Sequence, residues 1–266
     1  MKILAIFTCF NRRELTKRGL ETLALNKEVQ FDFVVVDDAS TDGTVEMLRQ
    51  QPFQIDIVEG NGSLFWNGGM HKAIEYAKKT YPDYEYYMLM NDDTKFFPGI
   101  FDEILPTLQK DTVVVGALCN DEGELSYGGV KYTRGIKYDK LGPEASEVSC
   151  STFNANCVIV PHDIFVQVGI DPFYKHSIGD FDYGLQISRL GYEIHVFPKY
   201  VGQCNDNSLA KTWQDRSLPR KERIRLKESR KGLPGDDWFH YLKKNFGLGT
   251  ALVRSVTPYI KILIGK

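Results

Sequence analysis

A hydrophobic strand that ends in a row of oxygen-bearing side chains decides the fold of this chain. Residues 86–94 read Tyr-Tyr-Met-Leu-Met-Asn-Asp-Asp-Thr, so the apolar run is followed at once by Asn91, Asp92 and Asp93. Ligands of open α/β sheets lie beyond the carboxyl ends of the strands. Carboxylates there suit Mg²⁺ or Mn²⁺, which proteins hold together with phosphate oxygens of a substrate. The stretch is typical of a metal–diphosphate site, and equally of a strand-end turn, because Asn and Asp favour turns.

Three predicted strands before this stretch are also followed by polar residues. They cover residues 2–8, 31–36 and 55–58. Segments with helical spacing follow each of them, at 14–25, from 45 and at 69–79. Ser40 or Thr41 is the expected cap of the second helix. Alternating strands and helices predict a parallel sheet with crossover helices. The polar strand ends converge on one sheet edge and indicate a nucleotide site; they are Thr8 and Asn11, Asp37 and Asp38, Asn61, and Asn91 to Asp93.

The second half of the chain is expected to add strands at 113–118 and 157–161 and a hairpin around 127–132. Helical spacing follows Asp180 and Asp182 and stops at Gly191. Both carboxylates therefore belong to the start of a helix, where the helix dipole favours their ionised form. Capping of the helix is the alternative role for each of them.

Composition excludes several classes of protein. The 266 residues are 42% hydrophobic and 26% charged with a net charge of −2, which gives no support to nucleic-acid binding. The five cysteines are far apart and form no CxxC pair, as expected of reduced thiols in the cytoplasm. The short apolar N-terminus is predicted to be a strand and not a signal peptide. No apolar run reaches the ~18 residues of a membrane span.

Four motifs, in this order, resemble the family 2 glycosyltransferases, and among them rhamnosyltransferase-like enzymes of bacterial polysaccharide synthesis. The motifs are Thr8-Cys9-Phe10-Asn11-Arg12, Val35 to Thr44 (VVDDASTDGT), Asn91-Asp92-Asp93 and Gly179-Asp180-Phe181-Asp182. The resemblance implies an α/β protein of the GT-A (Rossmann-like) fold, with a central, mostly parallel sheet flanked by helices. Residues 1–205 would form this domain, divided into a nucleotide-binding half, 1–118, and an acceptor-side half, 119–205. Residues 206–266 would form a helical, basic and amphipathic C-terminal extension.

The resemblance also implies an activity and assigns its residues. The activity is inverting transfer of a sugar from a UDP- or dTDP-sugar to a hydroxyl of a glycan or lipid-linked glycan during synthesis of a bacterial surface polysaccharide. Asp180 matches the general base, with Asp182 in support, and Asp93 matches the ligand of Mg²⁺ or Mn²⁺. The implied nucleotide-binding residues are Thr8, Phe10, Asn11, Asp38, Asn61, Trp66, Asn91 and Asp92.

This chain departs from the family pattern at three places. Asn91 replaces the usual first Asp of the metal motif, Gly179 replaces a common Glu before the base, and residues 200–207 lack a metal-binding His. His195 lies within a strand pattern, where we expect a structural role. Asn91 and the missing His keep open a non-catalytic nucleotide-sugar-binding module. A nucleotidyltransferase is a weaker alternative, because residues 8–13 contain no glycine.

The C-terminal extension begins with a basic segment. Residues 211–231 contain nine Lys or Arg and three Asp or Glu, which is typical of a solvated helical face. The aromatic and apolar segments that follow, broken by Arg254, Pro258 and Lys261, suit either an anionic membrane surface or a dimer or core-covering helix. The first alternative would make the protein peripheral at the inner membrane face.

Overall fold

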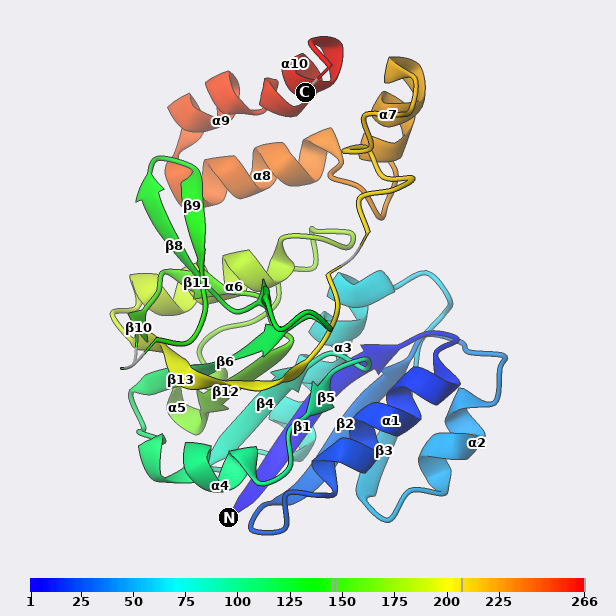
Figure 1. Ribbon diagram of the computed structural model, residues 1–266, viewed down its shortest axis with the longest axis vertical. Helices are drawn as coiled ribbons and strands as arrows, with labels where there is room; N and C mark the ends of the chain where they lie inside the picture. The colour runs from blue at the N-terminus through cyan, green and yellow to red at the C-terminus, as the bar shows by residue number, and fades with distance from the viewer. Residues whose placement is uncertain (145, 147, 207, 266) are drawn as a thin grey trace.

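A mixed sheet forms the centre of the molecule in the computed structural model, which describes residues 1–144, 146, 148–206 and 208–265 (Figure 1). Its first four strands are all parallel, in the spatial order β3-β2-β1-β4. They are β1 (Lys2–Cys9), β2 (Gln30–Asp37), β3 (Gln54–Glu59) and β4 (Tyr86–Met90). The connecting helices are α1 (Arg13–Leu23), α2 (Thr44–Arg49) and α3 (Phe65–Thr80). The predicted parallel sheet with crossover helices is confirmed.

The second half of the chain extends the same sheet beyond β4. Strand β12 (Cys157–Pro161) runs antiparallel between β4 and β6 (Thr112–Cys119), and β13 (Glu193–Gln203) runs parallel to β6. Short strands complete the edge: β5 (Lys95–Phe96), β7 (Leu125–Tyr127) and β10 (Val148–Ser149). A separate small sheet has the order β11-β8-β9, with β8 (Gly129–Arg134), β9 (Lys137–Leu141) and β11 (Thr152–Phe153). The helical elements here are α4 (Ile100–Ile104), the 3₁₀ turn Leu105–Thr107, α5 (His162–Phe165) and α6 (Gly179–Arg189).

The large sheet is buried on both faces, and β1 shows why. Ile3, Ala5 and Phe7 pack with apolar side chains of α1, α2 and α4, whereas Leu4 and Ile6 pack with those of α3, α5 and α6. Successive side chains of a strand point to opposite faces, so an uninterrupted apolar run serves two cores at once. The continuous hydrophobic runs of the sequence therefore mark central strands of a three-layer α/β domain.

Three local predictions are corrected by the structure. Helix α3 begins at Phe65 and not at Gly69. The hairpin is formed by β8 and β9, because β7 leaves to pair with β6. At the start of α2 the side chain that accepts from the first turn is Asp42, whose Oδ1 receives the Thr44 N–H at 3.1 Å. Ser40 and Thr41 are instead bound to Asn11 of the neighbouring loop.

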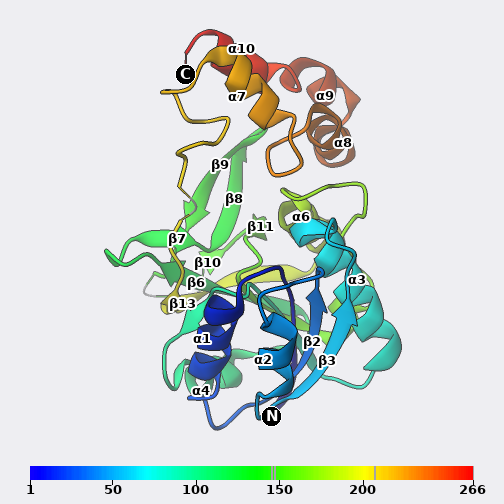
Figure 2. The ribbon, with the colours of Figure 1, turned by 90° about the vertical axis from the view of Figure 1, so that its right-hand side faces the viewer.

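The C-terminal extension folds back onto the domain and lies above the carboxyl ends of the parallel strands (Figures 1 and 2). Its helices are α7 (Arg220–Lys227), α8 (Gly235–Phe246), α9 (Leu248–Arg254) and α10 (Thr257–Leu263). Tyr241 and Leu242 of α8 form a third apolar cluster with Tyr174, against which Phe181 of α6 and Ile136 of the β8–β9 turn pack. The core-covering alternative is thus confirmed for α8. The domain boundary near residue 205 stays a prediction.

The basic start of the extension is not wholly a solvated face, which corrects our prediction. Arg223 is 2% exposed and Lys227 is 0% exposed. Lys227 donates to Glu228 and to the backbone oxygen of Leu233, both at 2.7 Å, and its ammonium lies 4.0 Å from the centre of the Tyr259 ring. These cations hold the extension together from inside. Within the described residues, the helices are too short or too polar to traverse a lipid bilayer.

Candidate active site

The loops at the carboxyl ends of β1 to β4 are tied to one another by side-chain hydrogen bonds. Asn11, after β1, accepts from the Thr41 N–H at 2.7 Å, and its own N–H donates to Ser40 at 2.9 Å. Trp66, which follows the β3 loop, donates its indole N–H to Asn91 after β4 at 2.9 Å. The polar strand ends predicted to converge on one sheet edge therefore do so.

Asp38 organises the loop that follows β3. Its Oδ1 accepts the N–H groups of Asn61 and Gly62 at 3.1 and 2.8 Å, and its Oδ2 accepts those of Leu64 and Phe65 at 2.9 and 3.2 Å. A carboxylate offers about four lone-pair positions, and the chain itself occupies all of them. Asp38 thus shapes the loop from Asn61 to Phe65, and a nucleobase N–H must replace one of these donors to reach it.

The first loop combines a close helix approach with an exposed aromatic ring. Thr8 donates to the Val36 carbonyl at 2.9 Å and packs directly against Gly69 of α3, where a Cβ would lie 2.2 Å from the Thr8 hydroxyl oxygen. Phe10 is 49% exposed at the rim. A large exposed apolar ring beside loop backbone is free to contact a flat ligand such as a base.

Asn91 and Trp66 are partners of each other. The Asn91 Oδ1 atom already accepts the indole N–H, so this oxygen is engaged within the chain. The Trp66 ring is partly buried and packs on the core that lies under α3. These contacts give both residues a structural role in aligning the β3 loop with the β4 loop.

Arg12 pairs with both carboxylates after β4. Its Nη1 lies 3.0 Å from Asp92 Oδ1 and 2.7 Å from Asp93 Oδ2. Asp92 is 6% exposed and its Oδ2 has no hydrogen-bond partner among the described residues. Burial raises the pKa of Asp92 to about 7, although the Arg12 charge acts in the opposite direction. Asp93, at the rim, is the more accessible carboxylate.

The donor set around Asp93 fits a divalent ion only in part. The Cys204 thiol donates to Asp93 Oδ1 at 3.5 Å, and burial raises the pKa of this thiol to about 12, which favours its protonated form. Within the described residues, no group of three or more His, Cys, Asp or Glu side chains has the geometry of a metal site. Mg²⁺ commonly binds through one or two carboxylates plus substrate phosphates. Asp93 therefore suits an ion that is held mainly by a diphosphate.

Asp180 lies in the first turn of α6, which begins in a strained conformation. Ile178 before it has φ = 64°, a rare value for a β-branched residue. The following Gly179 has no room for a side chain, because a Cβ would lie 1.8 Å from Asn67 Oδ1 of α3. The close approach of α3 and α6 thus requires a glycine at position 179, where family members commonly have Glu. Such strain clusters at functional sites, and Asn11, Ala39 and Phe65 at the same rim also have positive φ.

The environment of Asp180 suits a proton acceptor. Burial raises the pKa of its carboxyl to about 6, while the N–H groups of Phe181 and Ala155, at 2.8 and 3.4 Å, favour the charged form. A base is most effective when its pKa lies near the working pH. Burial raises the pKa values of Tyr132 and Tyr138 in the β8–β9 hairpin, and the negative charge of Asp180 raises both further. The Tyr138 ring lies 5.6 Å from the ring of Phe181, the residue after Asp180, so aromatic side chains of the hairpin lie near this carboxylate.

A short segment after β11 links Asp180 to the carboxylates of β4. The Ala155 N–H donates to Asp180, and the Asn156 carbonyl accepts from the Asn91 N–H at 3.4 Å and from Thr94 at 3.3 Å. Asn156 also contacts Cys204, the residue beside Asp93, at 3.9 Å. Asp180, the acidic motif and the β3 loop thus belong to one connected structure.

Asp182 has a different role from the expected cap or support of the base. Its side chain is 0% exposed and accepts from Lys244 at 2.7 Å, Asn245 at 2.8 Å and Gln186 at 2.9 Å. Lys244 also reaches Asp171 at 2.7 Å. Asp182 therefore anchors the C-terminal extension on α6.

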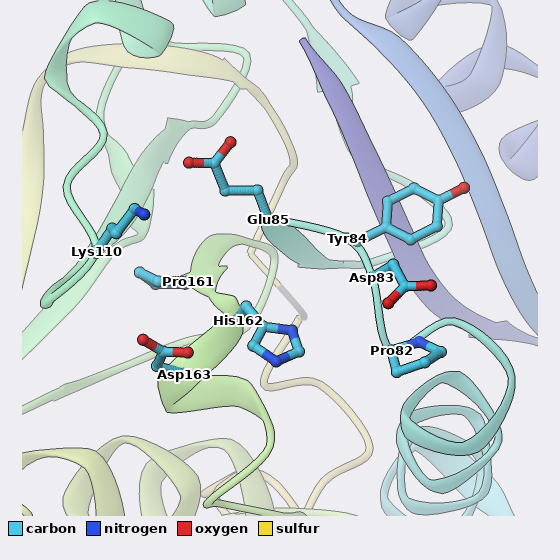
Figure 3. A pocket seen from close by; sticks show the side chains of 8 residues that line it. All are labelled: Pro82, Asp83, Tyr84, Glu85, Lys110, Pro161, His162 and Asp163. Atoms are coloured by element: carbon cyan, nitrogen blue, oxygen red, sulfur yellow. The ribbon is translucent and has the colours of Figure 1, made fainter.

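A surface cleft outside this rim does not belong to the site. It measures about 290 Å³ and is lined by the turn before β4 and the start of α5, including Glu85, Lys110 and Asp163 (Figure 3). Pro161 of its lining pairs with Tyr86, the first residue of β4. This cleft is at the amino end of β4, opposite Asn91 to Asp93, and takes no part in the site.

Comparison with known proteins names the family. The family model described as "Glycosyl transferase family 2" matches residues 5–155, which cover β1 to β4 and the segment beside Asp180. The chain belongs to glycosyl transferase family 2. No curated protein matches this family 2 chain significantly.

Solved structures share the fold of this family 2 protein at low sequence identity. One is a mannosyltransferase from Pyrobaculum calidifontis in complex with GDP-Man and Mn²⁺, which is 14% identical with a TM-score of 0.56. The superposition covers 99% of this chain and 73% of the mannosyltransferase chain. Residues 1–349 of TarS from S. aureus, in complex with UDP-GlcNAc, are 12% identical with a TM-score of 0.57, over 98% of this chain and 81% of theirs. At such identities the likeness shows the fold alone, and it confirms the GT-A architecture.

The candidate site also contains residues to which the sequence assigned no role. Arg12 neutralises the acidic pair, Asn67 ties α3 to the loop before α6 by donating to the carbonyls of Asp171 and Tyr174 at 2.9 and 2.8 Å, and residues 154–156 bridge the two halves. Of these, only Arg12 stood in a quoted motif. The others lie in stretches without periodicity, so no pattern marked them.

Proposed function

We propose that this protein is an inverting glycosyltransferase that moves a sugar from a nucleoside diphosphate donor, a UDP- or dTDP-sugar, to an acceptor hydroxyl. The single observation that carries the proposal is the link between Asp180 and Asp93 through residues 154–156, beside the loop that Asp38 shapes. A proton acceptor and a diphosphate-side carboxylate are thereby held in one structure. The mannosyltransferase and TarS complexes, which contain GDP-Man and UDP-GlcNAc, support a nucleotide-sugar donor.

On the donor side, Thr8, Phe10, Asn11 and the loop from Asn61 to Trp66 surround the nucleoside in this proposal. Phe10 supplies an exposed ring for the base, and the Asp38 network fixes the loop that covers it. Asn91 and Asp92 align this loop and the acidic motif from below. The donor would then lie across the carboxyl ends of β1, β2 and β4, where open α/β sheets bind ligands.

Asp180 would take the proton from the acceptor hydroxyl as its oxygen attacks the anomeric carbon. The new carbon–oxygen bond forms while the bond to the diphosphate oxygen breaks on the opposite side, so the anomeric configuration inverts. The electron pair leaves with the nucleoside diphosphate, and the proton remains on Asp180. Base catalysis of this kind contributes ~10²–10⁴-fold.

Asp93 would hold Mg²⁺ or Mn²⁺ together with the diphosphate, and such an ion would offset negative charge on the leaving group. Arg12 lies at the same place, with its guanidinium within 3.0 Å of both carboxylates. Its positive charge acts on the same leaving group through the protein itself. Guanidinium groups suit phosphate oxygens because of their fork of donors.

The acceptor would enter over the aromatic wall of Tyr132, Tyr138 and Phe181. The Tyr138 ring is 48% exposed and lies 5.6 Å from the Phe181 ring. Exposed aromatic rings beside a carboxylate suit a sugar, which presents apolar C–H faces and polar hydroxyls. We propose a glycan or lipid-linked glycan of a bacterial surface polysaccharide, acted on in the cytoplasm, consistent with the five buried free cysteines.

A thermal-shift screen of UDP- and dTDP-sugars with and without Mn²⁺ tests the donor proposal. A donor present at 100 times its Kd stabilises the protein by about 2.7 kcal/mol, and the winning compound identifies the base and the sugar. The Asp180→Asn variant then separates an enzyme from a non-catalytic binding module. Loss of donor turnover with retained donor binding supports the enzyme, whereas binding without turnover in the unaltered protein supports the module.

A further inference from the structure

Helices α9 and α10 present their large aliphatic side chains outward. The residues that pack against the rest of the extension are the buried Ala251, Pro258 and Ile262. The exposed ones, between 48% and 67% accessible, are Leu248, Leu252, Val253, Val256, Ile260, Leu263 and Ile264. Surface helices of globular proteins normally turn their apolar stripe toward the core. We call these seven side chains the α9–α10 apolar face.

Helices α9 and α10 are attached to the rest of the extension through other side chains, so the α9–α10 apolar face is not needed for packing inside the extension. Tyr259 of α10 donates to Glu228 at 2.6 Å and covers the Lys227 ammonium, and Trp238 donates to the Arg254 carbonyl at 3.4 Å. These bonds hold α9 and α10 in place from their inner sides. Seven large, exposed aliphatic side chains on two successive helices point to an interaction surface.

The charge around the face identifies its partner. Residues 238–266 contain five Lys or Arg and no Asp or Glu. Arg254 and Lys261 are exposed on the same two helices as the apolar face. An exposed apolar face on two helices that carry Arg254 and Lys261 and no acidic side chain of their own fits the surface of an anionic bilayer, where the aliphatic groups enter the headgroup boundary.

The charge of the whole molecule favours one orientation on that surface. Residues 206–266 contain fourteen Lys or Arg and six Asp or Glu, whereas residues 1–205 contain nineteen Lys or Arg and twenty-nine Asp or Glu. An anionic surface therefore attracts the extension and repels the domain. Figures 1 and 2 show the extension at the end of the molecule where the parallel strands terminate, so docking turns the strand-end loops toward the bilayer.

We propose that α9 and α10 dock this protein on anionic membrane surfaces, with the strand-end site directed at the lipid. The docking does not depend on the identity of donor or acceptor. Docking in this orientation would bring a lipid-linked acceptor close to Asp180. The position also differs from our sequence prediction, which included the basic segment 211–231, because Arg223 and Lys227 of that segment are buried inside the extension.

Co-sedimentation with sucrose-loaded vesicles tests the proposal on the full chain. Vesicles of phosphatidylcholine with an equal part of phosphatidylglycerol are compared with pure phosphatidylcholine vesicles. We expect at least tenfold stronger partitioning onto the anionic vesicles, weakened by salt. The variant Leu252→Asn, Val253→Asn, Ile260→Asn is expected to lose at least tenfold of this partitioning. The variant Arg254→Gln, Lys261→Gln is expected to lose about fivefold for each charge removed.

A matched control changes three exposed aliphatic residues of the domain: Leu25→Asn, Val166→Asn and Leu190→Asn, which are 51%, 43% and 52% exposed. It is expected to bind vesicles as the unaltered protein does. Equal melting temperatures of all variants establish that they fold. Vesicle binding that is absent, or that falls equally in the control, overturns the proposal. So does a dimer, seen by light scattering, that the triple α9–α10 variant abolishes, because a second copy then occupies the face. The nucleotide-sugar thermal shift is measured on the same proteins and reports separately on the proposed activity.

Discussion

Replacing Asp182 by Ala is expected to loosen the C-terminal extension from the domain. The carboxylate is 0% exposed and accepts three hydrogen bonds, two of them from Lys244 and Asn245 of α8 at 2.7 and 2.8 Å. Breaking a buried ion pair by removing one partner costs about 3–5 kcal/mol when the other charge is left unpaired. The cost here should be smaller, because Lys244 keeps Asp171 at 2.7 Å and Asn245 keeps the Tyr241 carbonyl at 3.1 Å.

Hydrogen bonds to charged groups contribute roughly 1.5–3 kcal/mol each. Because Lys244 and Asn245 both keep a second acceptor, we expect a net loss equivalent to one such bond, about 2–3 kcal/mol, for Asp182→Ala. Urea unfolding followed by circular dichroism measures the loss, and limited proteolysis shows whether the extension is released first. Asp236→Ala is the matched control, since Asp236 pairs with Lys175 at 2.6 Å but is 59% exposed. Exposed pairs contribute only about 0.2–1 kcal/mol. A loss for Asp182→Ala no larger than that of the control would refute the anchoring role.

Three further outcomes are expected. Asp180→Asn should lower kcat by ~10²–10⁴-fold with little change in donor Kd. Because the pKa of Asp180 is raised to about 6, the unaltered enzyme should lose activity as the pH falls through 6. A flat activity profile from pH 5 to 8 would argue against Asp180 as the base. Gly69→Ala places a Cβ 2.2 Å from the Thr8 hydroxyl oxygen. We therefore expect the free energy of unfolding to fall by roughly 1–3 kcal/mol, measured by thermal unfolding, and nucleotide binding to weaken. An unchanged melting temperature would contradict the close packing. Arg12→Ala frees Asp93 from a guanidinium at 2.7 Å, so Mn²⁺ binding without nucleotide, measured by electron paramagnetic resonance, should tighten by up to about fivefold. Weaker Mn²⁺ binding would show that Arg12 assists the ion instead of competing with it.

The sequence by itself determined the parallel strands β1 to β4, the helices that connect them and the sheet edge that carries the site. Continuous apolar runs such as residues 86–90 indicate central strands, because both of their faces need burial. Parallel strands then bring their carboxyl ends to one edge, so the polar residues after β1, β2 and β4 had to meet. Asp93 and Asp180 were recognisable because each stands in a motif whose spacing is local.

Only the tertiary structure decided what these side chains contact. Asp182 and Lys244 are 62 positions apart in the chain, and Arg12 and Asp92 are 80 apart; no periodicity connects such pairs, since their meeting depends on how separate elements pack. The same holds for Gly179, which is required by Asn67 on another helix. The direction of the α9–α10 apolar face was likewise hidden. An amphipathic pattern fixes which residues share a helix face, and only packing against neighbouring helices shows whether that face turns inward or toward solvent.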